Sequence, residues 1–97
     1  MKLEWSTGAR EDLRPIADFI ATDNPRLARD WIHKLQVRAR RAAKYPHSGR
    51  KVPEYERDDY REILVGHYRI IYRVNPTRIV VVGVYEGHRR LPTVSDG

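Results

Sequence analysis

The chain opens with a short alternation of polar and apolar residues and continues with apolar residues at helical spacing. Residues 2–6 place Leu3 and Trp5 on one face, which predicts a short strand. Ser6 or Thr7 can then cap a helix, because either hydroxyl can accept a hydrogen bond from a free backbone N–H of the first turn. An amphipathic helix is predicted by the apolar stripe that follows, namely Ala9, Leu13, Ile16, Ala17 and Ile20.

A proline inside this stripe and an Asn-Pro pair after it set limits on the helices. Pro15 lacks the N–H that would bond the carbonyl of Glu11, so we expect a kink there or a late helix start. Asn24 followed by Pro25 is typical of an N-cap and a first helical residue. A second stripe ends at Pro46, because the residue before a proline avoids the helical conformation. Its members are Ala28, Trp31, Ile32, Leu35, Ala39 and Ala42.

After the predicted helical hairpin, a loop gives way to segments in which apolar and polar residues alternate. The loop covers residues 46–59 and contains two prolines and a glycine. Residues 60–65 and 68–74 have a period of two, which predicts two strands joined by the turn Gly66-His67. Residues 78–85 are apolar on both faces and predict the most buried strand.

Together these elements predict an α+β fold of order β-α-α-β-β-β, with a helical hairpin packed on one face of a small antiparallel sheet. We expect one domain over residues 1–97, with a mobile tail at 91–97. A two-residue loop at Gly66-His67 fixes the strand pairs as Val65–Tyr68, Leu64–Arg69, Glu62–Ile71 and Arg61–Tyr72. The face toward the helices then holds Ile63, Val65, Tyr68, Ile70, Tyr72 and Val74, and we expect Val80, Val82 and Val84 to be buried as well.

The opposite face of this strand pair mixes apolar and charged side chains. We expect it to be exposed, and such a mixture is typical of a binding surface. Its residues are Tyr60, Glu62, Leu64, Arg69, Ile71 and Arg73. Glu62 is placed to bridge Arg69 and Arg73 diagonally, so an ion-pair ladder is expected whether the face binds a partner or not.

The net charge of +6 comes from one segment of the chain. Residues 31–51 contain seven basic residues and no acidic one, whereas the remainder has 12 basic and 13 acidic residues. A local positive field indicates an anionic partner, either nucleic acid or an acidic protein; the alternative is a solvated helix face. Nucleic-acid binding is disfavoured because aromatic residues do not alternate with the arginines of this segment.

Several classes of protein are excluded by composition. The absence of cysteine excludes disulfide scaffolds and Cys-containing zinc sites. The four histidines lie on different predicted elements without ligand spacing, so we expect no metal and no cofactor. The N-terminus is charged before any apolar run, and no apolar stretch approaches ~18 residues. We therefore expect a cytoplasmic protein with no membrane partner.

Two sequence blocks in the second half are specific in combination. Residues 49–54 read Gly-Arg-x-Val-Pro-Glu, and residues 61–73 read Arg-Glu-Ile-Leu-Val-Gly-x-Tyr-Arg-Ile-Ile-Tyr-Arg. With the Leu-Glu-Trp-Ser start, the Asn-Pro helix junction and His88-Arg89, the chain resembles the ParE branch of the ParE/RelE toxin superfamily over roughly residues 3–90.

The resemblance implies a bacterial type II toxin, of the kind that serves plasmid stabilization, which inhibits growth by poisoning DNA gyrase. It also implies a cognate antitoxin encoded beside it, with which it forms a hetero-oligomer. The residues expected to bind the target or the antitoxin are Arg50, Glu62, Leu64, Arg69, Ile71, Arg73, His88 and Arg89.

The RelE branch offers the alternative of an endonuclease that cuts mRNA on the ribosome. Such an enzyme needs proton donors and acceptors beside cations at the scissile phosphate. Two features disfavour it. Lysine occurs only at Lys51 in residues 48–59, where RelE-type sites bring several basic residues, and no tyrosine or histidine follows Arg89. We expect no catalytic residues; under the alternative they would be Arg61, Tyr85, His88 and Arg89.

Overall fold

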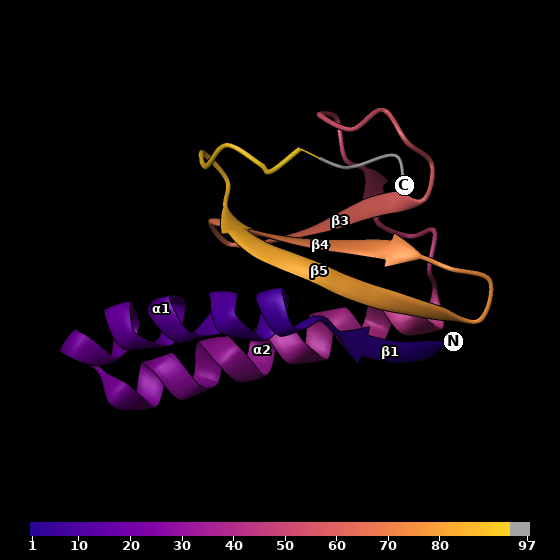
Figure 1. Cartoon of the computed structure of the whole chain (residues 1–97). Coiled ribbons are helices and arrows are strands. Elements are labelled where there is room, and N and C mark those ends of the chain that lie inside the picture. The colour runs from indigo at the N-terminus through magenta and orange to yellow at the C-terminus, as the bar shows by residue number, and fades with distance from the viewer. Residues whose placement is uncertain (94–97) are drawn as a thin grey trace.

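The computed structural model describes residues 1–93 and contains two helices and a five-stranded sheet (Figure 1). The elements are β1 (Lys2–Trp5), α1 (Thr7–Asp23), α2 (Pro25–Lys44), β2 (Arg50–Lys51), β3 (Tyr60–Val65), β4 (Tyr68–Val74) and β5 (Arg78–Glu86). The sheet order is β1-β5-β4-β3-β2, so β4 lies in the middle.

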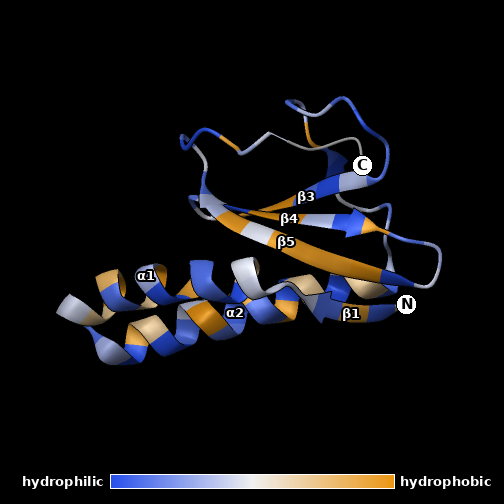
Figure 2. Cartoon of the chain, in the orientation of Figure 1, coloured by the Kyte–Doolittle hydropathy of each residue, from blue (hydrophilic) through white to orange (hydrophobic). Residues whose placement is uncertain are grey.

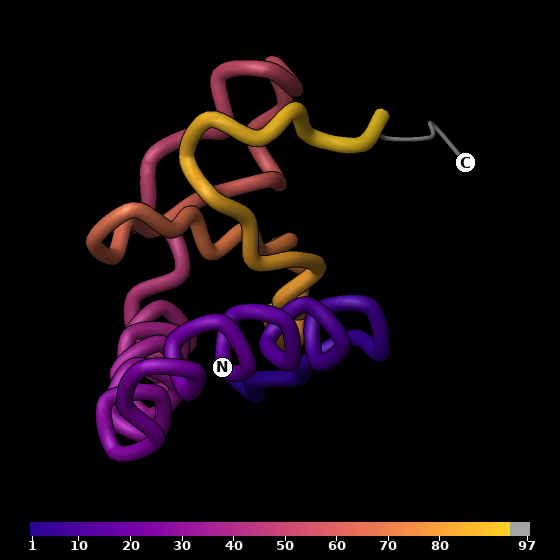
Figure 3. Tube along the Cα trace, turned by 90° about the vertical axis from the view of Figure 1, so that its left-hand side faces the viewer, coloured from indigo at the N-terminus to yellow at the C-terminus, as the bar shows by residue number. Residues whose placement is uncertain are grey.

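The helical hairpin of α1 and α2 lies on one face of the sheet (Figures 1 and 3). The loop between β2 and β3 and the chain after β5 lie on the other face. This arrangement confirms the predicted α+β fold with two corrections. The sheet is mixed, because β1 runs parallel to β5 while the other pairs are antiparallel. The predicted loop 46–59 also contains the short strand β2.

Both helices begin where the sequence places a cap. The Ser6 hydroxyl accepts a hydrogen bond from the N–H of Ala9 at 3.0 Å, and the Asn24 side-chain oxygen accepts one from Leu27 at 3.1 Å. The predicted start of α2 is thus confirmed. A late start of α1 at Pro15 is wrong, because α1 is already helical from Thr7 onward.

The hairpin of β3 and β4 has the predicted register at every pair. Gly66 in its turn has a φ of +59°, in the left-handed region that favours glycine. A Cβ at this position would also lie 2.6 Å from the ring of Trp31 in α2. The turn is therefore fixed both by backbone conformation and by contact with the helical layer.

The predicted buried residues of β5 are only partly correct, because the register between β4 and β5 shifts at Ile71/Tyr72. This irregularity changes which side chains face the helices. Val84 is buried as predicted, but Val80 and Val82 are only partly buried, and Ile79 and Val81 occupy the core instead. The apolar run of β5 is visible in Figure 2. The most buried stretch, however, is the four consecutive buried residues 69–72 of β4.

The face of β3 and β4 away from the helices is largely covered, so its expected exposure is wrong. The loop between β2 and β3 crosses it, and the Tyr55 hydroxyl donates a hydrogen bond to the carbonyl of Pro92 at 2.7 Å. The residues buried on this face are Glu62, Arg69 and Ile71. Leu64 stays open, with 49% of its surface exposed. Residues 94–97 of the expected mobile tail lie outside the described residues.

Tyr72 of β4 ties the sheet to the chain that leaves α2. Its side chain is fully buried, and its hydroxyl donates a hydrogen bond to the carbonyl of Pro46 at 2.7 Å. The same hydroxyl accepts one from the N–H of Gly49 at 3.2 Å. A Cβ at Gly49 would lie 2.5 Å from this oxygen, so only glycine lets the chain approach so closely. These contacts place β2 beside β3.

We predict that Tyr72→Phe lowers the free energy of unfolding by about 1–3 kcal/mol, because it leaves a buried N–H and a carbonyl without their partner. Urea denaturation followed by circular dichroism measures the change. Tyr45→Phe is the matched control, since Tyr45 is 55% exposed, and it should change stability by less than about 0.5 kcal/mol. Equal stabilities of the two variants would contradict an anchoring role for the Tyr72 hydroxyl.

Candidate functional site

A network of ion pairs centred on the buried residues Glu62 and Arg69 joins three strands and the covering loop on the far face of the sheet. Glu62 accepts hydrogen bonds from Arg50 through one carboxylate oxygen, with Nε at 2.6 Å, and from Arg69 through the other, with Nε at 3.1 Å. Arg69 also donates to both oxygens of Glu54, at 2.6 and 2.8 Å. The predicted residues Arg50, Glu62 and Arg69 are therefore brought together by the fold.

Electrostatics keep this network ionised. The hydrogen bonds that Arg69 donates hold the pKa of Glu54 at about 2, from 4.5 in an unfolded chain. The hydrogen bonds to Glu54 and Glu62 raise the pKa of Arg69 above its ordinary value. Arg69 is only 6% exposed and is fully engaged by two carboxylates. In this structure it is a structural cation that is not available to a partner.

The predicted ladder from Glu62 to both Arg69 and Arg73 is wrong in its second half. Arg73 instead donates a hydrogen bond to Asp59 at 3.1 Å. Glu62 turns to Arg50, because β2 places Arg50 directly opposite it in the sheet. The sequence pattern could not show this pairing, since it treated β2 as loop. A second, separate charge cluster therefore forms around Asp59.

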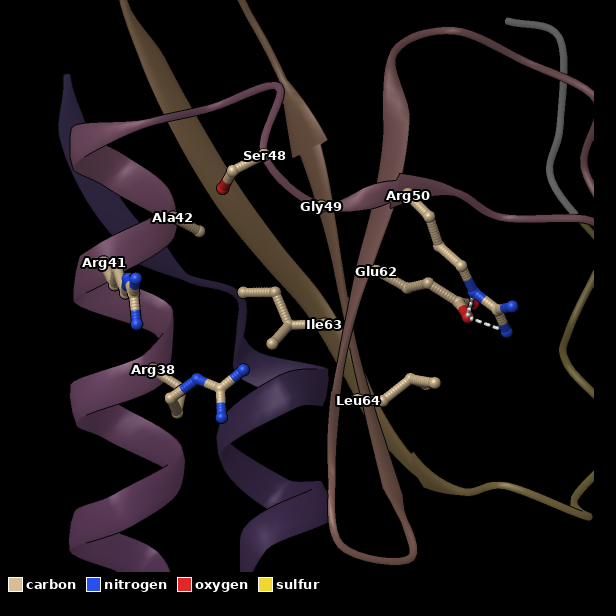
Figure 4. Close-up of a pocket in the computed structure, with 9 residues that line it drawn as sticks. All are labelled: Arg38, Arg41, Ala42, Ser48, Gly49, Arg50, Glu62, Ile63 and Leu64. Carbon is tan, nitrogen blue, oxygen red and sulfur yellow. Dashed lines mark hydrogen bonds and ion pairs between the residues drawn. The ribbon is translucent and has the colours of Figure 1, made fainter.

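A groove of about 350 Å³ opens between α2 and β3 (Figure 4). Arg38 and Arg41 line it from α2, and Ile63 and Leu64 line it from β3. Figure 4 shows Arg38 extending toward the strand. Neither α2 arginine forms an ion pair within residues 1–93. These two arginines were not predicted as site residues, although the acid-free segment 31–51 contains both.

Two further cavities meet at the end of β5. One, of about 500 Å³, lies against α1 and is lined by Phe19, His88 and Arg89 among others. The other, of about 460 Å³, contains Arg50, Leu64 and His88 in its wall. His88 lines both cavities. The predicted binding residues Arg50, Leu64, His88 and Arg89 are all exposed.

The four residues of the alternative ribonuclease site do not all converge: the Arg89 guanidinium lies 5.8 Å from the centre of the Tyr85 ring, whereas Arg61 lies apart from both. Arg61 pairs with Tyr72 in the register and donates hydrogen bonds to the carbonyls of Gly49 and Asp58. Tyr85 pairs with Arg69, so it faces the opposite side of the sheet from Arg61. Burial raises the pKa of Tyr85 above its ordinary value, which keeps its hydroxyl protonated at neutral pH.

The described part of the chain offers no grouping of three His, Cys, Asp or Glu side chains suited to a metal ion. Within residues 1–93, neither helix has the length and apolar character needed to cross a membrane.

Comparisons with known proteins agree with one another. A family model described as the ParE toxin of the type II toxin–antitoxin system parDE matches residues 3–91. Among solved structures, the chain is similar to one from the chromosomal ParDE toxin–antitoxin system of P. aeruginosa. That likeness has a TM-score of 0.74 at 19% identity, over 89% of this chain and 95% of the other. No curated protein sequence matches.

We predict that the Glu54–Arg69 pair makes stability depend on acid pH. The pKa of Glu54 is lower in the folded state, so the pair stabilises fully above about pH 4.5 and loses its effect as the pH falls toward 2. Because the Glu54 side chain is 44% exposed and screened by solvent, we expect a contribution of only about 1 kcal/mol.

Glu54→Gln should therefore be less stable than the wild type at pH 7 and should show a flatter dependence between pH 4.5 and 2. Glu56→Gln, a change at an exposed carboxylate of the same loop, is the control and should follow the wild-type curve. Thermal melts across this pH range measure both variants. Parallel curves for the wild type and Glu54→Gln would contradict the assignment.

Proposed function

This chain belongs to the ParE toxin family of type II toxin–antitoxin systems, and from that membership we propose that it inhibits DNA gyrase until a cognate antitoxin binds it. It acts by binding and not by cutting RNA. The antitoxin forms a hetero-oligomer with the toxin and covers the surface that would otherwise reach the target.

The observation that carries this proposal is the separation of the groups that an RNA-cleaving site would need. Arg61 and Tyr85 lie on opposite faces of the sheet. Arg69, the most buried cation on the far face of the sheet, is held by Glu54 and Glu62. A ribonuclease must place a proton acceptor and free cations around one phosphate. The positions of these side chains support a binding protein instead.

The residues proposed to touch gyrase or the antitoxin are those that remain exposed at the end of the sheet. Arg50, Leu64 and His88 line one cavity, and Arg89 continues the surface into the next. Ile71 is fully buried and cannot contact a partner in this conformation. The buried Glu62 and Arg69 act indirectly, because their ion pairs position the Arg50 side chain.

We predict that the purified protein inhibits gyrase supercoiling of relaxed plasmid DNA and leaves mRNA intact on programmed ribosomes. The physical reason is that the candidate cations do not gather around one phosphate position, because Arg61 lies on the opposite face of the sheet from Tyr85 and Arg69 is held by two carboxylates. Supercoiling gels and primer extension on the mRNA measure the two activities. Codon-phased cleavage of the mRNA without any effect on gyrase would overturn the proposal in favour of the RelE-type alternative.

We predict that His88→Ala weakens gyrase inhibition about tenfold, the loss expected of one contact worth about 1–2 kcal/mol. A general acid or base would lose about 10²–10⁴-fold in rate instead. The inhibitor concentration at half-maximal supercoiling measures the effect. His33→Ala, at an exposed position of α2, is the matched control and should inhibit as the wild type does. No change on His88→Ala would remove this residue from the interface.

A further inference from the structure

Part of β3 has no neighbouring strand at the edge of the sheet. β2 begins only at Arg50, which pairs with Glu62. In a longer β2, Ser48 would face Leu64. The N–H of Ser48 instead donates a hydrogen bond to the carbonyl of Tyr45, because the chain turns away toward α2 at this point. The strand position beside Leu64 in the sheet is therefore unoccupied, and it forms one side of the α2–β3 groove shown in Figure 4.

The backbone of Leu64 faces this open place. Successive residues of a strand in an antiparallel ladder direct their N–H and C=O groups to opposite sides, so residues two apart direct them to the same side. The carbonyl of Tyr60 accepts a hydrogen bond from Val52, on the side of β2. Leu64 stands an even number of residues after Tyr60, so its own N–H and C=O point to the same side. Within residues 1–93, no strand pairs with them there.

The wall of the groove opposite this strand edge is cationic. Arg38 and Arg41 are one turn apart on α2 and line the groove without a carboxylate partner in residues 1–93. The carboxylate in the groove, that of Glu62, already accepts hydrogen bonds from Arg50 and Arg69. The positive charges of Arg38 and Arg41 are therefore not neutralised by a carboxylate of the groove.

Next to this unpaired part of β3, the two faces of the sheet present different side chains. Ile63 points toward the helices, whereas Leu64 points to the far face and is 49% exposed (Figure 4). Side chains of a strand added here would also point alternately to the two faces. Those on the helix face would meet Arg38 and Arg41, and those on the other face would lie next to Leu64.

We propose that this groove takes an extended segment of the antitoxin, which adds a short strand beside Leu64 and alternates acidic with apolar side chains. The proposal rests on the proposed function, which supplies the antitoxin. Backbone hydrogen bonds give such strand addition its affinity, and the alternating side chains give it specificity. Nucleic acid fits less well, because no aromatic ring lines the groove to stack on a base.

Binding of the antitoxin encoded beside the toxin gene to charge variants of α2 tests the cationic wall. The double variant Arg38→Gln, Arg41→Gln should bind about 10- to 100-fold more weakly than the wild type in calorimetry at 0.15 M salt. The matched control, Lys34→Gln with Arg40→Gln, removes the same charge from exposed positions of α2 that do not line the groove. It should bind within about threefold of the wild type.

Amide hydrogen exchange in the wild-type complex tests the strand. The N–H of Leu64 should exchange at least about tenfold more slowly when the antitoxin is bound, because it becomes a backbone donor to the added strand. Weaker binding by the Arg38, Arg41 variant with no protection of Leu64 would overturn strand addition. Protection of Leu64 with unchanged affinity would overturn the acidic character of the segment. Failure of the wild type to bind the antitoxin would instead contradict the proposed function.

Discussion

The structure on the far face of the sheet depends on one buried ion pair, that between Arg69 and Glu62. Removing two charges from water costs several kcal/mol per ion, and their attraction offsets this only when the remaining donors and acceptors are satisfied. Here they are satisfied: Arg50 supplies donors to Glu62, and Glu54 accepts from Arg69. Each of these partners comes from a different segment, so the pair can be buried only if β2, β3, β4 and the covering loop assemble together.

This requirement explains why the loop between β2 and β3 lies on the sheet. Glu54 brings the loop to Arg69, and Tyr55 beside it donates a hydrogen bond to Pro92 in the chain after β5. The hydrophobic residue beneath, Ile71, is buried as a result. A small domain buries a limited share of its surface, so a covered second face adds apolar burial that the helical hairpin cannot provide. The ion pair thus supports both the charge network and the second hydrophobic layer.

The elements that local rules govern could be predicted from the sequence. The caps at Ser6 and Asn24 and the hairpin at Gly66 depend on neighbouring residues, and the structure has them where the pattern places them. The strand β2, the register shift at Ile71/Tyr72 and the covering loop depend on contacts between distant segments. Alternation along one strand carries no information about them, because it shows which residues share a face and not what covers that face.

The same limit applies to the candidate site. The sequence showed a segment rich in basic residues, and it showed several arginines and glutamates on one strand face. Only the folded structure shows which of these arginines are paired with carboxylates and which are not. Arg69 forms ion pairs with two carboxylates, and the partly exposed Arg50 forms one with Glu62. Arg38 and Arg41 have no carboxylate partner in residues 1–93. A net charge of +6 describes how the chain attracts anions at a distance. What a partner can bind at contact is the smaller set of cations that the protein leaves without a carboxylate, and Arg38 and Arg41, beside the open edge of β3, belong to this set.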